Sequence, residues 1–467
     1  MSGSDVDASF EILSNRFIDW LRDYGTTIST KVHLEDLRAR YAGRGAVAKE
    51  DIEQDEELFS IARSLVLTSE NSSLPLDITK DLEDPWPRLI LAMLHEHANA
   101  HSKWKPYLDI LPTEFDTLMY WSAEELRSLE GSAVVHKIGK DSADKLFHDT
   151  LIPIIRNHKG VFGPLDCSDD DIIALCHRMG STIMAYAFDL EDSTAPARNE
   201  EDGWEEDSDA GVTLPKGMVP LADMLNADAD LNNARLFHED GRVVMKATKA
   251  IKAGEELFND YGPLPRADVL RRYGYVTDDY AKYDVVEVSL DLIKHTAMEE
   301  FELSETEVEA RTQYLDHESV LDDGYDISRT ANEDGPFSDE LKIVSNALAM
   351  SKEEFDKTRT KGKILKPELS EQAVKLLYSL LVRRCAMYPS ATIETVADVA
   401  SQSGHAIAAT ERRLAMARAV IDGEKEVLRE AAQSLRDLTT SNKKRKADSF
   451  EHEVDALRTS IKQPKSG

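Results

Sequence analysis

The chain has 467 residues, of which 41% are hydrophobic and 31% charged, and 88 Asp and Glu against 56 Lys and Arg give a formal net charge of −32. This composition fits a globular protein of about two or three folded units, and the absence of any apolar run near the roughly 18–20 residues of a membrane span excludes a membrane-spanning class. The negative charge repels phosphate, so we expect no general nucleic-acid binding and no membrane association, but a basic protein partner.

The cysteines are few and scattered. Cys167, Cys176 and Cys385 suit neither a disulfide framework nor a zinc cluster built from thiolates. A reducing compartment, the cytosol or the nucleus, is therefore the simplest interpretation.

The first half of the chain predicts a change from β to helical structure. An amphipathic helix is expected over residues 10–24, with Phe17 and Leu21 on its apolar face. Short apolar runs separated by charged turns follow, as in small β-sheets. From about residue 82 to 183 the apolar residues recur at helical spacing, which predicts a large helical segment.

An acidic run separates this segment from a second β-rich stretch. Residues 191–211 carry nine Asp and Glu against the single Arg198, so we expect an exposed, disordered loop. Strand signals then return around the Asp240-Gly241 turn and the turn that ends at Gly254.

From about residue 291 the pattern is helical to the end of the folded chain. In the last helix, apolar residues recur every seven positions and predict a buried stripe of the domain core more than a dimer seam: Leu414, Ala417, Ile421, Leu428, Ala431, Leu435 and Leu438. After residue 439 the chain is polar, and we expect a disordered tail.

Three short stretches have the residue types of a binding site. The first is Ala42-Gly43-Arg44-Gly45, in which two glycines around one residue permit a sharp turn or a close approach of the backbone to a ligand. Taken alone, this pattern is equally that of a structural hairpin.

The second and third stretches add an amide and a group of phenols. Asn226 ends the apolar run from Val219, where its side chain can donate and accept hydrogen bonds or simply cap a turn. Tyr261, Tyr273 and Tyr275 lie within fifteen positions, a density that suits a narrow aromatic channel or ordinary edge packing.

In this order, the three stretches resemble the SET-domain protein-lysine methyltransferases, in the branch of the Rubisco large-subunit methyltransferase and the fungal ribosomal-protein lysine methyltransferases. Pro85-Trp86, the segment from Trp104 to Pro112, and Tyr120-Trp121-Ser122 are similar to segments of the helical insert in that branch. The resemblance covers about residues 17–280 with strong motifs and continues weakly through the C-terminal helices.

The resemblance implies an α+β fold class, namely a SET-domain β-fold split by a helical insert and followed by an all-α C-terminal substrate-binding domain. The expected parts are an N-terminal helical segment over 1–34, the SET domain over 35–285 with its insert at about 76–190 and acidic loop at 191–211, the helical domain over 286–438, and a tail over 439–467.

The resemblance also implies the cofactor, S-adenosyl-L-methionine, and the residues around it. Tyr261 is the implied catalytic residue, beside the methyl transfer. The implied cofactor-binding residues are Ala42, Gly43, Arg44, Gly45, Asn226, Ala227 and Tyr273. The implied lining of the lysine channel is Tyr186, Phe188, Asp223, Phe258 and Tyr275. Ala227 departs from the family, which usually has His after this Asn.

The implied mechanism follows from the acidity of lysine. An amine with a pKa near 10.4 costs about 4–5 kcal/mol to present in its neutral form at pH 7, and a dry aromatic channel lowers this cost. Tyr261 would hold the amine and Phe258 would help to exclude water. No metal is expected, because a cationic sulfur is already a good leaving group. His95, His97 and His101 lie close together, and His97 and His101 have the i, i+4 spacing of a zinc helix, but no third zinc ligand is evident in the sequence.

The expected substrate is a lysine of a non-histone protein, most plausibly a ribosomal protein. A histidine or a transcription-factor lysine as acceptor, and a catalytically silent SET module that only binds proteins, are the alternatives. The acidic run at 191–211 is expected to steer a Lys-rich substrate. Lys443-Lys444-Arg445-Lys446 indicates nuclear import or a solvated tail. The target lysine, the number of methyl groups and the oligomeric state do not follow from the sequence.

Overall fold

The computed structural model describes residues 3–40, 42–163, 167–190, 215–329, 335–362, 365–389 and 404–461. The predicted acidic loop at 191–211 lies outside these residues. They form two compact units, the first made of Met1–Trp121, Ile138–Leu264 and Asp268–Tyr280, and the second of Ser122–Lys137, Pro265–Ala267 and Ala281–Gly467. No helix within the described ranges is both long enough and apolar enough to cross a membrane.

The strands of the first unit form small antiparallel sheets with the orders β1-β4-β8-β7, β2-β3-β9 and β5-β6. Residues from both halves of the predicted SET domain contribute to the first two sheets, because β4 pairs with β8 and β3 pairs with β9. The strands are β1 (Thr27–Ile28), β2 (Val32–Asp36), β3 (Arg44–Ala48), β4 (Glu57–Ala62), β5 (Ala187–Asp189), β6 (Lys216–Met218), β7 (Ala234–Glu239), β8 (Arg242–Ala247) and β9 (Glu256–Leu257).

The predicted turns lie where these strands reverse. Gly241 and Gly254 have φ angles of +72° and +88°, which favour glycine, and Gly241 joins β7 to β8. The two β-rich halves predicted from the sequence are therefore confirmed as parts of shared sheets.

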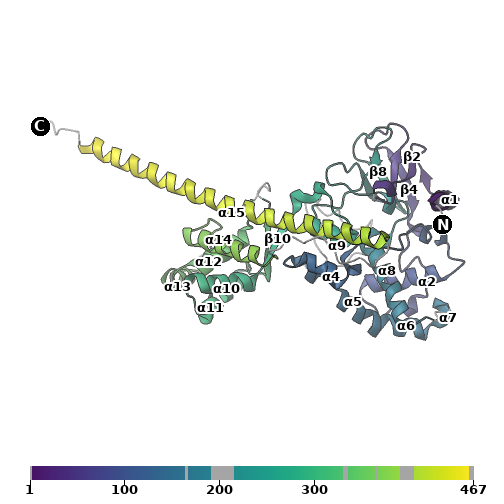
Figure 1. The fold of residues 1–467 in the computed structure, drawn as a ribbon, viewed down its shortest axis with the longest axis horizontal. Helices are drawn as coiled ribbons and strands as arrows, with labels where there is room; N and C mark the ends of the chain where they lie inside the picture. The colour runs from purple at the N-terminus through teal and green to yellow at the C-terminus, as the bar shows by residue number, and fades with distance from the viewer. Residues whose placement is uncertain are drawn as a thin grey trace. The chain divides into compact units, whose positions relative to one another are not determined.

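Helices fill the stretch between the two halves, as the sequence predicts (Figure 1). Asp84 caps α2 by accepting a hydrogen bond from the Trp86 amide, and Ser168 and Asp171 form a capping box at the start of α8. The helices of this unit are α1 (Gly3–Asp23), α2 (Pro85–Ala98), α3 (Lys105–Leu108), α5 (Lys140–Leu146), α6 (Ile152–Asn157), α7 (Lys159–Phe162) and α8 (Asp169–Tyr186), with one turn of π-helix at Phe147–Leu151.

One continuous apolar core joins the sheets to these helices. It contains Phe17 and Leu21 of α1, which are fully buried as predicted, together with the buried residues of β4, α2 and α8. The insert is thus packed into the same core as the strands that it interrupts.

The second unit is mainly helical, as predicted, and also contains a two-stranded antiparallel sheet that the sequence did not indicate. Residues 122–137, expected within the insert, belong to this unit. Its elements are α4 (Ala123–Leu126), β10 (Val285–Ser289), α10 (Leu290–Phe301), α11 (Glu305–His317), β11 (Gly324–Ser328), α12 (Asp339–Ala349), α13 (Lys352–Thr360), α14 (Glu371–Ala386) and α15 (Gly404–Ile461), while α9 (Arg266–Tyr273) begins here and ends in the first unit.

Helix α15 packs along α14 and the two strands of the second unit. Ala417, Ile421, Leu428, Ala431 and Leu435 of the predicted stripe are buried, which confirms that the stripe is core. Leu438 is different, because 44% of its surface is exposed.

The helical backbone of α15 continues to Ile461, where the sequence analysis expected a disordered tail from residue 439. Between Gly423 and Pro464 the chain contains neither Gly nor Pro, so no residue there ends the helix.

Polar groups are buried beneath the middle of α15. Glu424 accepts hydrogen bonds from Ser132 Oγ and Tyr388 Oη, both at 2.5 Å, and burial raises the pKa of its carboxyl to about 7. Beside it, Arg266 donates to Asp284 at 2.6 Å in an almost fully buried ion pair. A Cβ atom on Gly423 would overlap both members of this pair.

We expect Gly423→Ala to lower the free energy of unfolding by about 1–3 kcal/mol, since the ion pair cannot retreat from the added methyl group without losing its geometry. Gly160→Ala in α7 is the matched control, because no atom lies within 4 Å of the added Cβ. Chemical unfolding of both variants tests this; equal stability of the two would contradict it.

Candidate active site

The glycine-rich turn predicted to bind the cofactor leads into β3. The Leu37 amide donates to the Gly43 carbonyl at 2.8 Å, and the Ala42 amide donates to the Leu37 carbonyl at 3.2 Å. Gly43 has a φ of +63°, in the left-handed region that favours glycine. The turn is therefore closed on itself by backbone hydrogen bonds before the strand begins.

Glycine is required at position 45 for a different reason, because Asn226 and Glu256 approach its backbone closely. A Cβ atom there would lie 2.7 Å from Glu256 Oε1 and 3.2 Å from Asn226 Nδ2. Asn226 Nδ2 in turn donates to Glu256 Oε1 at 2.7 Å and to the Arg44 carbonyl at 3.3 Å. Burial raises the pKa of the Glu256 carboxyl. These contacts bring the glycine-rich turn, Asn226 and the strand β9 that precedes Tyr261 to one place.

The segments around Asn226 and Phe258 run side by side. The Asn259 amide donates to the Asn226 carbonyl at 2.8 Å, and Ala227 and Asn259 form a parallel bridge. The Phe258 amide donates to Asn233 Oδ1 at 2.8 Å. Ala227, where the family usually has His, thus contributes its backbone to the site even though it lacks an imidazole.

The predicted tyrosines form a cluster. The rings of Tyr261 and Tyr273 are stacked with centroids 3.9 Å apart and planes at 6°, and Tyr275 lies 6.3 Å from Tyr273 at 49°. Burial, and then the charges that Tyr275, Tyr273, Tyr186 and Tyr280 would carry, raise the pKa of Tyr261. Burial raises the pKa of Tyr273 to about 12. The phenols of the cluster therefore stay neutral across the physiological range.

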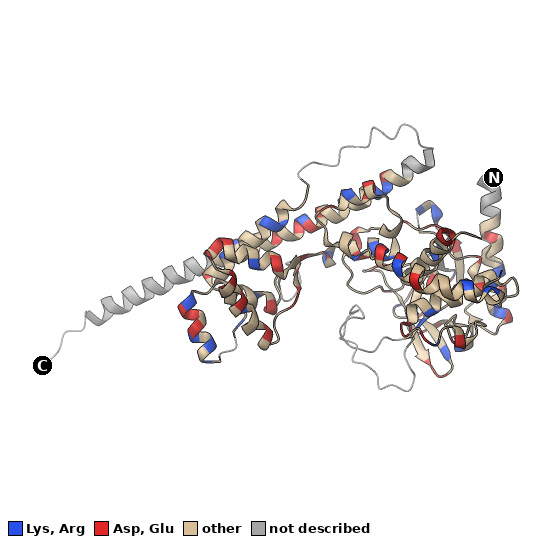
Figure 2. Ribbon diagram, turned by 90° about the horizontal axis from the view of Figure 1, so that it is seen from below, with Lys and Arg blue, Asp and Glu red and all other residues tan. Residues whose placement is uncertain are grey.

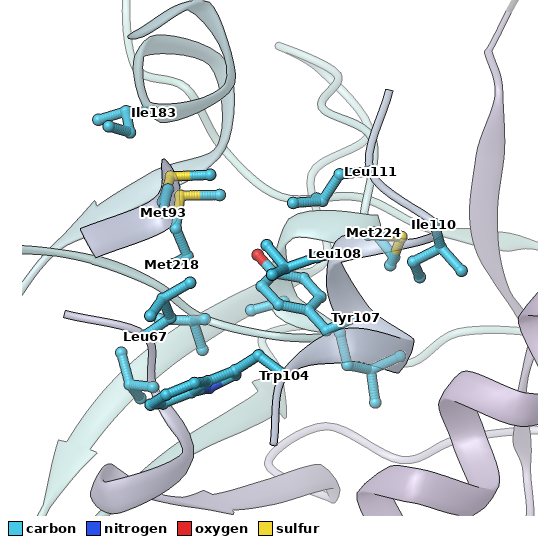
Figure 3. Close-up of a cluster of buried hydrophobic side chains, with 14 of the residues drawn as sticks. Leu67, Met93, Trp104, Tyr107, Leu108, Ile110, Leu111, Ile183, Met218 and Met224 are labelled. Atoms are coloured by element: carbon cyan, nitrogen blue, oxygen red, sulfur yellow. The ribbon is translucent and has the colours of Figure 1, made fainter. Parts of the chain in front are cut away.

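Asp223 and Tyr107 make a buried pair next to this cluster. The Tyr107 hydroxyl donates to Asp223 Oδ2, while Asp223 Oδ1 is buried with no hydrogen-bond partner among the described residues. Burial raises the pKa of Asp223 to about 8, and burial together with the charge of Asp223 raises that of Tyr186 to about 12. Figure 3 shows Tyr107 in the apolar surroundings that cause these shifts, among Trp104, Met224 and Leu108.

Two predicted channel residues are not shown to join the phenols. Phe188 lies in β5 opposite Gly217 and packs against the apolar core. Phe258 is half-buried, and the described contacts that fix it are those of its backbone. Their place in the channel stays a prediction.

Three residues of the site were missed by sequence reasoning. Glu256, Tyr107 and Tyr280 contact or electrostatically influence the predicted residues. Tyr107 belongs to the segment Trp104 to Pro112 that carries part of the resemblance, which was an available signal. Nothing in the local sequence distinguishes Glu256 or Tyr280 from surface residues.

His95 and His97 lie in α2, whereas His101 lies beyond the end of that helix at Ala98. His95 contacts the Val161 carbonyl at 2.8 Å and Ser73 Oγ at 2.9 Å, and His97 Nε2 lies 2.6 Å from Arg178 Nη2. Within the described ranges, no group of three or more His, Cys, Asp and Glu is placed to hold a metal ion.

We expect Asp223→Asn to flatten the dependence of stability on pH. The native carboxyl keeps its proton up to about pH 8, whereas in the unfolded chain it loses the proton near the ordinary pKa of 3.8. The contribution of Asp223 to the free energy of unfolding therefore falls as the pH rises from about 4 to about 8, and an amide has no proton to lose.

Urea unfolding at about pH 5 and about pH 8 measures this difference for the wild type and the variant. The exposed Asp81→Asn serves as the control and should follow the wild type. Parallel pH curves for Asp223→Asn and the wild type would show that the Asp223 carboxyl does not hold a proton in the folded state.

Comparison with known proteins gives the family. The SET domain model matches residues 43–262, the range from the glycine-rich turn to the residue after Tyr261. Ribosomal lysine N-methyltransferase 4 of Saccharomyces cerevisiae is 34% identical over 67% of this chain and 67% of its own length, and the protein of the same name from Schizosaccharomyces pombe is 26% identical over 91% and 96%. N-lysine methyltransferase setd6 of Xenopus laevis is 29% identical over 73% of this chain and 74% of its own length.

A solved structure has the same fold. The structure of Rubisco LSMT bound to AdoMet superimposes with a TM-score of 0.62 at 20% sequence identity and covers 91% of this chain and 92% of that one. The α+β fold predicted from the sequence is confirmed by this likeness. The matching SET domain model, the motif geometry and the 34% identity to a lysine N-methyltransferase lead to one conclusion. The chain belongs to the SET-domain family of protein-lysine N-methyltransferases.

Proposed function

We propose that the protein methylates a lysine in a basic segment of a ribosomal protein, with S-adenosylmethionine as the methyl donor. The observation that carries the proposal is that one compact unit contains both the glycine-rich turn tied to Asn226 and the stacked pair Tyr261–Tyr273. The two yeast relatives named ribosomal lysine N-methyltransferase support the choice of substrate.

The charge of the protein favours a basic substrate. Of its charged residues, 88 are acidic and 56 basic. Figure 2 shows that the described carboxylates are spread over the helices of both units. Such a surface attracts a Lys-rich segment over a screening length of about 8 Å at physiological ionic strength, which raises the rate of encounter more than the affinity.

The residues present fit the cofactor. The turn at Gly43 provides a backbone without side-chain obstruction, because nothing lies within 4 Å of a Cβ placed there. Asn226 uses its Nδ2 within the protein, so we assign the hydrogen bond to the cofactor to Oδ1. When bound, S-adenosylmethionine supplies an electrophilic methyl group on a cationic sulfur, and Ala42 to Gly45, Ala227 and Tyr273 would complete its site.

The channel residues act on the protonation of the substrate lysine. Neutral phenols and an Asp223 that is largely protonated below about pH 8 leave little negative charge to stabilise a buried ammonium group. Burial without a counter-charge lowers the pKa of the lysine and favours the nucleophilic amine. Tyr261 accepts a hydrogen bond from this amine and orients its lone pair, while Tyr186 and Tyr275 narrow the approach.

We expect Tyr261→Phe to slow methyl transfer by about tenfold or more, because it keeps the stacked ring but removes a hydrogen bond worth about 1–3 kcal/mol in a buried site. The Kd for the cofactor should change little. Single-turnover methyl transfer measures the effect, with the exposed Tyr24→Phe just after α1 as a control outside the cluster. An unchanged rate and product would remove Tyr261 from the mechanism.

The substrate is tested with purified ribosomal subunits and labelled S-adenosylmethionine, followed by mapping of the labelled residue. We expect the label on a lysine of one ribosomal protein. Label on a histidine, or on a lysine of a non-ribosomal protein in a lysate from a deletion strain, would contradict the proposed substrate. Calorimetry that detects no cofactor binding would support the silent protein-binding module instead.

We also propose that the protein is nuclear, on the strength of the basic run Lys443 to Lys446 near the end of α15. Clustered cations on a solvated segment are the usual form of an import signal. Replacing the four residues by Ser in a tagged copy should shift the protein to the cytoplasm; an unchanged distribution would refute the proposal.

A further inference from the structure

Within the glycine-rich turn, Arg44 has a long side chain that contacts other segments of the first unit. Gly43 and Gly45 on either side of it have no side chains, and Arg44 is contacted by segments distant in the sequence. Its guanidinium carbon lies 3.9 Å from the centre of the Phe10 ring, its Nε donates to Ser14 Oγ at 3.0 Å, and its Nη1 donates to the Ile110 carbonyl at 3.0 Å.

The two contacts to α1 form a small preorganised acceptor. Ser14 Oγ donates its own proton to the Phe10 carbonyl at 2.9 Å, so the lone pairs of the hydroxyl remain for Arg44. Phe10 and Ser14 are one turn apart and lie on the same face of the helix. A rotation or loss of α1 would remove both contacts at once.

The hydrogen bonds of the Arg44 side chain go to neutral groups, while Asp36, opposite Arg44 on β2, attracts its charge and Arg38 repels it. No ion pair of Arg44 with a carboxylate occurs among the described residues, and burial lowers the pKa of the guanidinium without discharging it. The neighbouring Arg38 also lies over Phe10, at 4.3 Å, but it is paired with Asp36 at 2.6 Å. Because the short-range contacts of this half-buried cation are one ring, one hydroxyl and one carbonyl, its position is sensitive to the position of each.

The backbone of Arg44 is tied to the cofactor site from the other side. Its carbonyl accepts the hydrogen bond from Asn226 Nδ2 at 3.3 Å. The side chain of Arg44 thus contacts α1 and Ile110, and its backbone carbonyl contacts Asn226, the residue predicted to bind the cofactor.

We propose that Arg44 is a positioning residue, and that through it the N-terminal helix α1 sets the conformation of the cofactor-binding turn. The inference rests on the proposed cofactor site. Its consequence is that affinity for S-adenosylmethionine depends on Phe10 and Ser14, neither of which is in the turn or its strand.

The experiment compares Ser14→Ala, Ser14→Thr and Phe10→Leu with the wild type. The first removes the acceptor, the second keeps a hydroxyl and the third keeps apolar volume but removes the aromatic face. Arg22→Ala, at the exposed end of the same helix, is the matched control. Calorimetric Kd values for S-adenosylmethionine, steady-state kcat and both KM values, and thermal unfolding are measured for each.

We expect Ser14→Ala and Phe10→Leu each to raise the Kd and the KM for S-adenosylmethionine by about threefold to tenfold, as for loss of one hydrogen bond or one cation–π contact. The kcat and the KM for the protein substrate should change by less than about twofold. Ser14→Thr and Arg22→Ala should bind the cofactor like the wild type.

A double-mutant cycle shows whether Ser14 acts through Arg44. In an Arg44→Ala background, Ser14→Ala should add nothing to the loss of cofactor affinity. Additive losses, or an unchanged Kd with a lowered melting temperature, would show that α1 only stabilises the fold and would overturn the inference. A wild-type protein that binds the cofactor but methylates no lysine would contradict the proposed function alone.

Discussion

The Asn226 side chain makes the interaction on which the site depends. Its Nδ2 donates to the backbone carbonyl of Arg44 and to the Glu256 carboxylate, while the backbone carbonyl of Asn226 accepts from the Asn259 amide. Three segments from the two ends of the SET domain are thereby fixed at one residue. Unpaired, the Glu256 carboxylate in this half-buried place would cost free energy, so the same contacts that shape the site are also those that the fold cannot readily lose.

Sequence reasoning reached the architecture because its signals are local or belong to motifs. Period and turn residues indicated the helical segment over about 82–183 and the β7–β8 hairpin, and the resemblance carried by the three motifs implied that a helical insert splits one domain. Asn226, Tyr261 and Tyr273 were found in the same way, since the family pattern names them. The stacking of Tyr261 on Tyr273 was not contained in that pattern, because it depends on where the segment after β9 meets the end of α9.

What escaped prediction depends on contacts between distant residues. Glu256 and Tyr107 are an ordinary acid and an ordinary tyrosine until Asn226 and Asp223 are placed beside them. Residues 122–137 likewise belong with the C-terminal helices, as the hydrogen bond from Ser132 to Glu424 shows. These two residues are 292 positions apart, so the sequence alone does not pair them. The sheet formed by β10 and β11 was missed because each strand is five residues long and lies between helices.

The pairing of β4 with β8 also determines the order in which the molecule can fold during translation. The helices α2, α3 and α5 to α8 lie between the two strands in the sequence, so they are synthesised before β8. Strand β4 has no partner on its β8 side until Val243 and Val244 have been synthesised and have left the exit tunnel. During that interval the buried residues Phe59 and Ile61 lie on an incomplete sheet. The apolar residues available to cover them in that interval are those of α1 and the insert, which share their core in the folded protein.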